Sequence, residues 1–279
     1  LATDVATRTA HPKWLIDRWT RKFGAERAAK IAEANQQLSY PDVFVTQTPD
    51  AFVAQTSDVV VAQTLLSVPG APSKLVPGMF KLTGSSANVE GYALDEGSGV
   101  IADIAAAASK DILDLAAAPG GKTIVMRARG AKVVSNDVSI GRIRPLIGRS
   151  REIVISDGRQ PPFRKKFEAV LLDAPCSATG IIRKNPEIKW RLREGDFARF
   201  AVLQRELLSS AIKYASKYVI YSTCSLEPEE NDDVVSGYER GDVGEFVNDE
   251  VRKWVDDGVL RLTPESGADG FTAFVLRVR

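Results

Sequence analysis

The chain has 279 residues, a formal net charge of +1, 44% hydrophobic residues and 26% charged residues. These values are ordinary for a soluble globular protein that forms one large or two modest domains. No apolar run approaches the roughly 20 residues that span a bilayer, and the N-terminus shows no signal-peptide pattern. The only two cysteines lie far apart, which excludes a secreted disulfide framework, so we expect a cytoplasmic protein without membrane contact.

The single histidine, His11, excludes several catalytic classes. Ser-His-Asp and Cys-His hydrolases need a histidine base beside the nucleophile. Structural zinc needs four ligands of Cys or His type, and the chain has only three such residues, one His and two Cys. We therefore expect no metal site, and catalysis has to rest on Cys, Asp, Lys, Arg and backbone groups.

The N-terminal third of the chain predicts a small module. Apolar residues at helical spacing predict one helix over about 12–24 and a second over 25–37. Residues 41–90 contain short strand-like runs, such as VVVAQ at 59–63, between many Pro and Gly residues. This pattern favours a helical and α+β module over residues 1–90.

Beyond residue 90, predicted strands alternate with predicted helices. The strands are 111–116, 132–137, 152–156, 167–173, 217–222, 259–262 and 271–278. The helices are 98–108, one after AAPGGKT, about 140–148, about 196–215 and one from about Glu229. This alternation predicts an α/β domain with a doubly wound, mainly parallel sheet over residues 91–279.

The first strand-to-helix turn of this region reads LDLAAAPGGKT at 113–123. Its small residues, which include Gly120 and Gly121, let the backbone approach a ligand closely. The turn is neither a Walker A loop nor a strict GxGxxG fingerprint. Asp137 ends the next strand about 20 residues on, where an acid grips ribose hydroxyls. These features predict an adenosine-containing cofactor and leave NAD and S-adenosylmethionine both open.

Four aspartates, Asp114, Asp137, Asp157 and Asp173, mark the ends of predicted strands. Asp137 suits the ribose of a cofactor and Asp157 suits its adenine amino group. Asp173 is expected between the cofactor and the groups that face Cys176. Any one of these acids could instead cap a helix or shape a turn, but four at the same sheet edge favour a ligand site.

The two cysteines each follow an apolar strand directly. Cys176 comes after AVLLD at 169–173, and Cys224 comes after YVIYS at 218–222. Parallel sheets bind ligands outside the carboxyl ends of their strands. Two soft nucleophiles at that edge indicate covalent chemistry on an electrophilic ring. The alternative interpretation is a pair of buried cysteines that act as small apolar side chains.

Charge is unevenly distributed along the chain. Two basic segments, 142–166 and 183–193, surround the first cysteine, and the segment from Glu227 to Asp257 is strongly acidic. A near-neutral total can hide a basic face over an active site. The alternative for each basic segment is ordinary solvated surface charge.

The motifs LDLAAAPGGKT, SNDVS, SDGR, LLDAPCSATGIIRKNPEIKW and YSTCSLEPEEN, in that order, resemble the RNA 5-methylcytosine methyltransferases. The resemblance is strongest to the Sun/Fmu type, which includes bacterial 16S ribosomal RNA small-subunit methyltransferase B. It extends from about His11 to Arg279 and is most specific between residues 111 and 232. The long segment around Cys176 is highly specific, whereas the glycine turn alone is not.

The resemblance implies a Rossmann-like catalytic domain that uses S-adenosylmethionine as methyl donor. It implies that Cys224 is the nucleophile, that Cys176 assists product release, and that Asp173 holds the reacting base. The cofactor residues that it implies are Ala116, Ala117, Ala118, Pro119, Gly120, Gly121, Lys122, Asp137, Asp157 and Asp173.

The resemblance also implies RNA as the partner, and we expect 16S rRNA, bound in part by the N-terminal module. Ala116 stands where the family often has Cys, and Leu94 stands where Gln is common. Type B members carry a further N-terminal domain that resembles the antitermination factor NusB, for which this chain has no room. Because the chain begins at Leu1, we expect a piece of a longer protein; the sequence does not fix its oligomeric state, and a monomer is favoured.

Three other functions are weighed against this one. A DNA cytosine methyltransferase uses a single Pro-Cys nucleophile, so the second cysteine, Cys224, argues against it. A catalytically silent RNA-binding or ribosome-assembly module would not need both cysteines and the aspartates. A nicotinamide dehydrogenase is disfavoured because no histidine lies near the predicted site.

Overall fold

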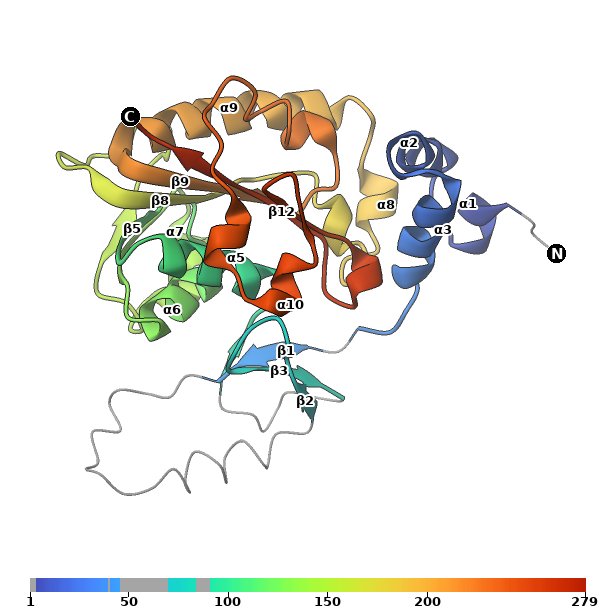
Figure 1. Ribbon diagram of the computed structural model, residues 1–279, viewed down its shortest axis with the longest axis horizontal. Coiled ribbons are helices and arrows are strands. Elements are labelled where there is room, and N and C mark those ends of the chain that lie inside the picture. Colours follow the sequence, from blue (N-terminus) through green and yellow to red (C-terminus); the bar gives the residue numbers. More distant parts are fainter. Residues whose placement is uncertain (1–3, 40, 46–69, 84–90) are drawn as a thin grey trace.

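The computed structural model describes residues 4–39, 41–45, 70–83 and 91–279. Its centre is an eight-stranded sheet with helices on both faces, so the α/β fold class is confirmed. In Figure 1, helix α9 lies along one face of the sheet, and α5, α6 and α10 lie on the other. No helix in this part of the chain combines the length and the apolar character needed to cross a membrane.

Three short helices open the described chain. They are α1 (Val5–Arg8), α2 (Lys13–Phe23) and α3 (Ala25–Ala34). Gly24, with φ of 82°, ends α2 and lets the chain turn into α3. The buried side chains of α2 and α3, Trp19 among them, share a cluster with Ile182 and Leu226. The N-terminal helices therefore pack on the loops that follow the two cysteines.

A small antiparallel sheet follows the helices. Its order is β2-β3-β1-β4, with β1 (Asp42–Phe44), β2 (Gly70–Pro72), β3 (Met79–Leu82) and β4 (Tyr92–Ala93). The predicted strand-like run at 59–63 lies outside the described residues. Strand β4 begins one residue after the start of the predicted catalytic domain and pairs with β1. The small sheet is thereby joined directly to α5, the first catalytic-domain helix.

The large sheet has the order β10-β11-β12-β9-β8-β5-β6-β7. Strands β5 to β9 pair in parallel, and β12, β11 and β10 add an antiparallel edge. The order reverses between β5 and β8, and ligands of open α/β sheets bind at such a switch point. The strands are β5 (Asp111–Asp114), β6 (Lys132–Asp137), β7 (Ile153–Ile155), β8 (Phe167–Asp173), β9 (Ala215–Thr223), β10 (Val255–Asp256), β11 (Val259–Leu262) and β12 (Phe271–Arg277).

Two apolar cores form on the two faces of this sheet. Neighbouring β5 residues point to opposite sides, so Ile112 joins the core under α5 and α6, and Leu113 joins the core under α9. Asp95 caps the N-terminus of α5 through its carboxylate. The helices are α5 (Glu96–Ala108), α6 (Gly121–Ala128), α7 (Ile140–Ile143), α8 (Ile188–Arg191), α9 (Asp196–Tyr214) and α10 (Asp249–Arg252).

The prediction of a helix from about Glu229 is wrong. The chain makes one 3-10 turn, Pro228–Glu230, and continues in turns. The amide of Asn231 donates to the backbone oxygens of Ser225 and Glu227, which holds this segment against the cysteine loop instead of in a helix. The helix predicted over 140–148 is also shorter, because α7 gives way to a 3-10 turn that contains Pro145.

The backbone of the two cysteine loops leaves no room for a side chain at Gly180. Its N–H donates to the oxygen of Cys224 at 2.9 Å, and its oxygen accepts from the N–H of Gly270 at 2.8 Å. A Cβ atom at Gly180 would lie 2.3 Å from the oxygen of Gly270. We predict that Gly180→Ala lowers the free energy of unfolding by about 1–3 kcal/mol, measured by urea denaturation. Gly195→Ala is the matched control, because no atom lies within 4 Å of that Cβ position; equal stability of both variants would contradict the prediction.

Candidate functional site

The two cysteines lie side by side. Strands β8 and β9 are parallel neighbours, with Asp173 opposite Ser222 in the register, and each cysteine follows within three residues. The two sulfur atoms are 3.3 Å apart, and both side chains are partly exposed. The structure therefore brings together the two thiols that the sequence placed at one sheet edge.

The environments of the two thiols differ. The hydrogen bond with Cys224 raises the pKa of Cys176 well above its ordinary value, and burial and the charges of Glu230 and Asp173 act in the same direction. Cys176 consequently stays protonated at neutral pH. Its S–H can then donate a hydrogen bond to the sulfur of Cys224, 3.3 Å away.

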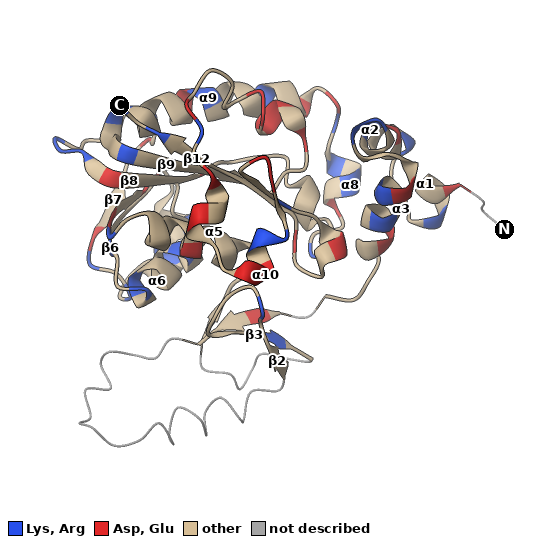
Figure 2. Ribbon diagram, in the orientation of Figure 1, with Lys and Arg blue, Asp and Glu red and all other residues tan. Residues whose placement is uncertain are grey.

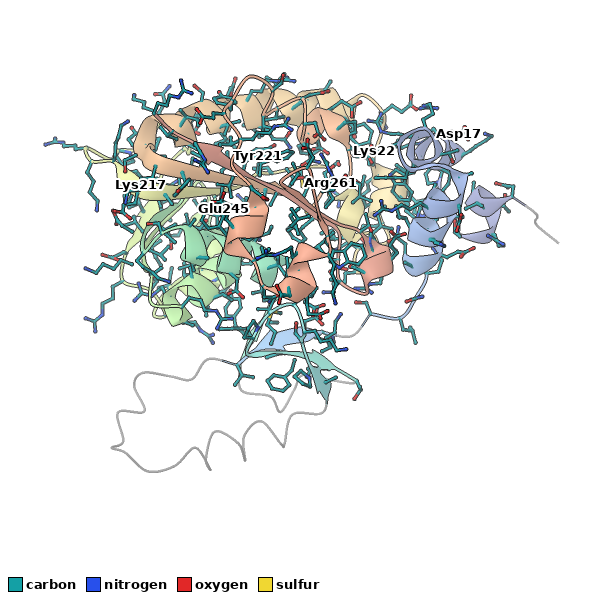
Figure 3. The ribbon with its side chains drawn as sticks, in the orientation of Figure 1. Asp17, Lys22, Lys217, Tyr221, Glu245 and Arg261 are labelled. Carbon is teal, nitrogen blue, oxygen red and sulfur yellow. The ribbon has the colours of Figure 1, made fainter. Side chains whose placement is uncertain are left out.

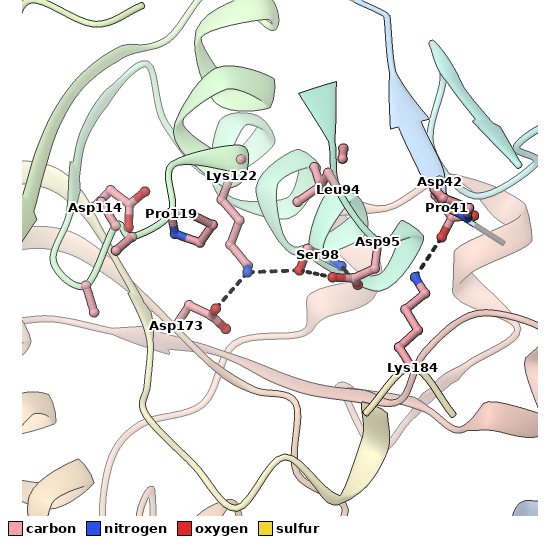
Figure 4. Close-up of a pocket in the computed structure, with 15 residues that line it drawn as sticks. Pro41, Asp42, Leu94, Asp95, Ser98, Asp114, Pro119, Lys122, Asp173 and Lys184 are labelled. Atoms are coloured by element: carbon pink, nitrogen blue, oxygen red, sulfur yellow. Dashed lines mark hydrogen bonds and ion pairs between the residues drawn. The ribbon is translucent and has the colours of Figure 1, made fainter. Parts of the chain in front are cut away.

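A cavity of about 300 Å³ lies at the switch point of the sheet. Figure 4 shows it between the turn before α6, the end of β8 and the small sheet. It is lined by Pro41, Asp42, Ala93, Leu94, Asp95, Ser98, Asp114, Ala116, Ala117, Ala118, Pro119, Gly121, Lys122, Asp173 and Lys184. The sulfur atoms lie outside this lining, and Asp173, three residues before Cys176, links the cavity to the thiols.

Lys122 is the centre of a polar chain across the cavity (Figure 4). Its Nζ lies 2.6 Å from Oδ2 of Asp173 and donates to Oγ of Ser98 at 3.0 Å. Burial alone would lower the pKa of Lys122, but the charges of Asp173 and Asp95 outweigh it and raise the pKa. The other oxygen of Asp173 accepts from Ser222 at 2.8 Å. Lys122 therefore fixes the Asp173 carboxylate between the cavity and the thiols.

Asp114 is a buried acid with an unused acceptor. Thr123 donates to its Oδ2 at 2.7 Å, whereas its Oδ1 is buried and has no hydrogen-bond partner among the described residues. Burial raises the pKa of Asp114 to about 7. Because Asp114 also lines the cavity, this oxygen is available to a donor on a bound ligand.

Asp137 supports the turn beside the cavity. Its Oδ2 accepts from the N–H of Ala118 at 3.0 Å, and its Oδ1 accepts from Ser139 and Arg142. The side chain is 2% exposed and is not part of the cavity lining. Gly120, with φ of 111°, also lies outside the lining and passes close to Leu146.

Asp157 is not brought into the cavity. Its carboxylate accepts from Arg159, which also pairs with Glu206. The hydrogen bonds from Arg159 lower the pKa of Asp157. The residue is partly exposed beyond the end of β7, so the structure leaves it at the same sheet edge but apart from Asp114 and Asp173.

Several cavity residues were missed by the sequence reasoning. Lys184 lies 3.1 Å from Asp42 of the small sheet and 2.8 Å from Asp269 before β12. Asp95 and Ser98 come from the N-terminus of α5. These residues belong to elements far apart in the chain, and no local spacing could reveal that they face one cavity.

The basic segments divide into paired and unpaired groups. In the first, Arg142, Arg159 and Lys165 form ion pairs with nearby aspartates. In the second, Arg191 and Arg193 are exposed and form no ion pair with a described residue. Figure 2 shows basic residues on α8. The neighbouring indole of Trp190 is 69% exposed. The surface next to the Cys176 loop therefore combines free positive charge with an exposed aromatic ring.

The raised pKa of Asp114 predicts a dependence of stability on pH. The native protein keeps this proton from about pH 4 to about pH 7 while the unfolded chain loses it, so stability falls as pH rises through this interval. In the wild type we expect the free energy of unfolding to fall by on the order of a few kcal/mol between these pH values. We predict that Asp114→Asn does not show this fall, measured by urea denaturation. Burial lowers the pKa of His11 to about 4 and gives a slope of opposite sign, so the difference between wild type and variant is the quantity to compare. Parallel pH profiles of the two proteins would contradict the prediction.

Comparisons with known proteins identify the family of this chain. The family model of the 16S rRNA methyltransferase RsmB/F matches residues 103–272. Ribosomal RNA small subunit methyltransferase B of Sodalis glossinidius is 41% identical over 175 residues, which cover 58% of this chain and 37% of the relative. The protein of that name from Citrobacter koseri is 33% identical over 247 residues, which cover 80% of this chain and 56% of the relative. The chain thus spans between about a third and somewhat over half of these relatives.

Solved structures agree on the architecture. The crystal structure of a methyltransferase homolog protein from Pyrococcus horikoshii superposes with a TM-score of 0.74 at 23% identity, over 100% of both chains. This likeness supports the fold alone. Together with the family match over more than half of the sequence, it agrees with the resemblance that the motifs indicated. The chain belongs to the 16S rRNA methyltransferase RsmB/F family.

Proposed function

We propose that this protein transfers a methyl group from S-adenosylmethionine to carbon 5 of a cytosine in RNA, through a covalent adduct with Cys224. The observation that carries the proposal is the pair of thiols 3.3 Å apart beside the Lys122–Asp173 pair. A lone nucleophile suffices to form an adduct, whereas a second thiol beside it suits release of the product. The names of the bacterial relatives favour small-subunit ribosomal RNA as substrate, which would place the activity in the cytoplasm.

The residues of the cavity fit the methyl donor. The free buried oxygen of Asp114 and the carboxylate of Asp95 suit an ammonium group, and the start of α6 presents backbone N–H groups toward a carboxylate. The turn from Ala116 to Gly121 carries no bulky side chain and allows close approach. Asp137 would hold the ribose, and Asp157 stays our prediction for the adenine amino group.

Cytosine carbon 5 is a poor nucleophile until a thiolate adds at carbon 6. We assign this attack to Cys224, whose sulfur lies 3.3 Å from that of the protonated Cys176. Asp173, held by Lys122 and Ser222, accepts a hydrogen bond from the exocyclic amine and holds the base beside the Lys122 ammonium, which offsets the negative charge that develops at the ring nitrogen. When bound, S-adenosylmethionine supplies the methyl group to carbon 5.

Release of the product reverses the first step. A water molecule takes the proton from carbon 5, the electrons of that C–H bond form the double bond between carbons 5 and 6, and the Cys224 sulfur leaves carbon 6 as a thiolate. Cys176, at 3.3 Å, donates a hydrogen bond to this leaving sulfur and stabilises it. The role of Cys176 therefore follows from its protonation, which its surroundings enforce.

RNA has to present an unstacked base to this site. A cytosine inside a stem cannot reach the thiols without leaving the stack. The unpaired guanidinium groups of Arg191 and Arg193 lie close in sequence to the Cys176 loop and suit contacts with phosphates. Binding should accordingly weaken as salt concentration rises.

Replacement of each cysteine by alanine is predicted to separate their roles. Cys224→Ala should abolish methyl transfer to RNA, because no adduct can form, while binding of S-adenosylmethionine stays unchanged. Cys176→Ala should accumulate a covalent protein–RNA adduct, because the leaving sulfur has lost its donor. Incorporation of labelled methyl groups and a denaturing gel measure the two outcomes.

The same assay separates the alternative functions. Acceptance of methyl groups by unmodified small-subunit RNA should be sensitive to RNase and insensitive to DNase. Sensitivity to DNase alone would favour a DNA cytosine methyltransferase, and no incorporation at all would favour a silent RNA-binding module. If Cys224→Ala traps RNA and Cys176→Ala turns over normally, the two assignments are exchanged.

The acids at the sheet edge are predicted to bind the cofactor. Asp137→Asn and Asp157→Asn should each weaken S-adenosylmethionine binding about tenfold or more, a loss of at least about 1.4 kcal/mol, measured by titration calorimetry. Glu152→Gln is the matched control, because Glu152 precedes β7 at the opposite sheet edge. Unchanged affinity in Asp157→Asn would remove this residue from the cofactor site and leave its carboxylate as the partner of Arg159 alone.

A further inference from the structure

We propose that Glu230 is the positioning residue that holds both reactive thiols in place. The consequence for catalysis rests on the function proposed above, whereas the placement of the sulfur atoms does not. Glu230 is fully buried and lies on the 3-10 turn that follows the Cys224 loop. It acts through the serine that follows each cysteine.

A single carboxylate joins the two cysteine loops. Its Oε1 accepts from the N–H of Ser177 at 2.9 Å and from the side chain of Gln204 at 3.1 Å. Its Oε2 accepts from the hydroxyl of Ser225 at 2.5 Å and from the hydroxyl of Ser177. Ser177 directly follows Cys176, and Ser225 directly follows Cys224. Four donors therefore converge on Glu230, and three of them belong to the residues adjacent to the thiols.

The backbone of Glu230 is itself fixed. The hydroxyl of Tyr221, on β9 (Figure 3), donates to the Glu230 backbone oxygen at 2.6 Å. The next residue, Asn231, accepts from Thr223 at 2.8 Å and donates to the backbone of Ser225. The position of the carboxylate is therefore set by the sheet, and the carboxylate in turn sets the two loops.

The Glu230 carboxylate is neither a surface charge nor a helix cap, because it is buried and its donors come from the two cysteine loops and from α9. A buried acid without partners would be costly, and here four donors, all from the protein, compensate its burial. Removal of the carboxylate leaves the two serine hydroxyls, the Ser177 N–H and the Gln204 amide without their shared acceptor. The loops would then be joined only by their direct bonds, such as Gly180 N–H to the Cys224 oxygen and the contact between the two serine hydroxyls. We expect the two sulfur atoms to be held less tightly at 3.3 Å.

The experiment measures the sulfur positions directly and the activity separately. The full chain is treated with diamide, which takes two electrons and two protons from the thiols and leaves a Cys176–Cys224 disulfide. Wild type should cross-link fastest, Glu230→Gln more slowly, and Glu230→Ala at least about tenfold more slowly, because the effective concentration of one thiol at the other falls. The amide of Gln keeps the size of the side chain and part of its bonding, so it serves as the conservative variant.

Glu229→Ala is the matched control, since this neighbouring acid pairs with Arg18 and does not contact the serines. In the methyl-transfer assay, Glu230→Ala should lower kcat by about 100-fold and leave the affinity for S-adenosylmethionine unchanged. Ser177→Ala and Ser225→Ala provide the same test if Glu230→Ala does not fold. Each should slow cross-linking in the wild-type background, and the additional slowing should be smaller in the Glu230→Gln background.

Cross-linking of Glu230→Ala, or of both serine variants, at the wild-type rate would overturn the proposal. Slow cross-linking with normal kcat would show that the thiols are anchored by Glu230 but that their placement does not limit the reaction, which overturns the catalytic part. If wild type methylates no RNA and the cross-linking order still holds, the proposed function fails and the anchoring role stands.

Discussion

The parallel pairing of β8 with β9 is the constraint on which the site depends. Both strands end at the edge of the sheet where the switch point between β5 and β8 lies, and their register places Asp173 opposite Ser222. After each strand the backbone makes a short loop that contains one cysteine. Two thiols that are 48 residues apart in the sequence thereby become neighbours. The buried core on both faces holds this pairing rigidly, since Leu171 and Leu172 of β8 point into opposite cores. The positions of the two thiols are therefore fixed by the geometry of the sheet.

Charge compensation explains how so many ionised groups share one edge. Lys122 makes three of these interactions: it forms an ion pair with Asp173, donates a hydrogen bond to Ser98 and is attracted by the charge of Asp95. Burial raises the pKa of Asp114 to about 7, so this acid carries only part of a negative charge at neutral pH. The cavity therefore contains two ion pairs, Lys122–Asp173 and Lys184–Asp42, beside an acid that is only partly ionised. The ammonium group of a ligand would favour the ionised form of Asp114, whose unpartnered oxygen can then accept a hydrogen bond.

The sequence predicted the α/β sheet, because each parallel strand was an apolar run followed by a turn and a helix. It also predicted that Cys176 and Cys224 would meet, since both follow strands of one sheet. It could not predict the lining from Asp42, Asp95 and Lys184, because tertiary packing alone brings those elements together. The helix expected at Glu229 failed for a related reason: its acid and amide side chains bond to the cysteine loop, which local propensity does not register.

The N-terminal helices support the loop that follows Cys224, although they precede the large sheet by many residues. The indole N–H of Trp19 donates to the carboxylate of Glu227 at 3.0 Å, and Arg18 forms an ion pair with the same carboxylate. Glu227 is fully buried and lies three residues after Cys224. A shorter chain that began at the large domain would expose Leu226 and leave a charged group inside an apolar surface without partners. Any replacement of the N-terminal region must therefore supply a hydrogen-bond donor in place of Trp19 and a cation in place of Arg18. Without them the buried carboxylate of Glu227 would lack partners, and the loop after Cys224 would be destabilised.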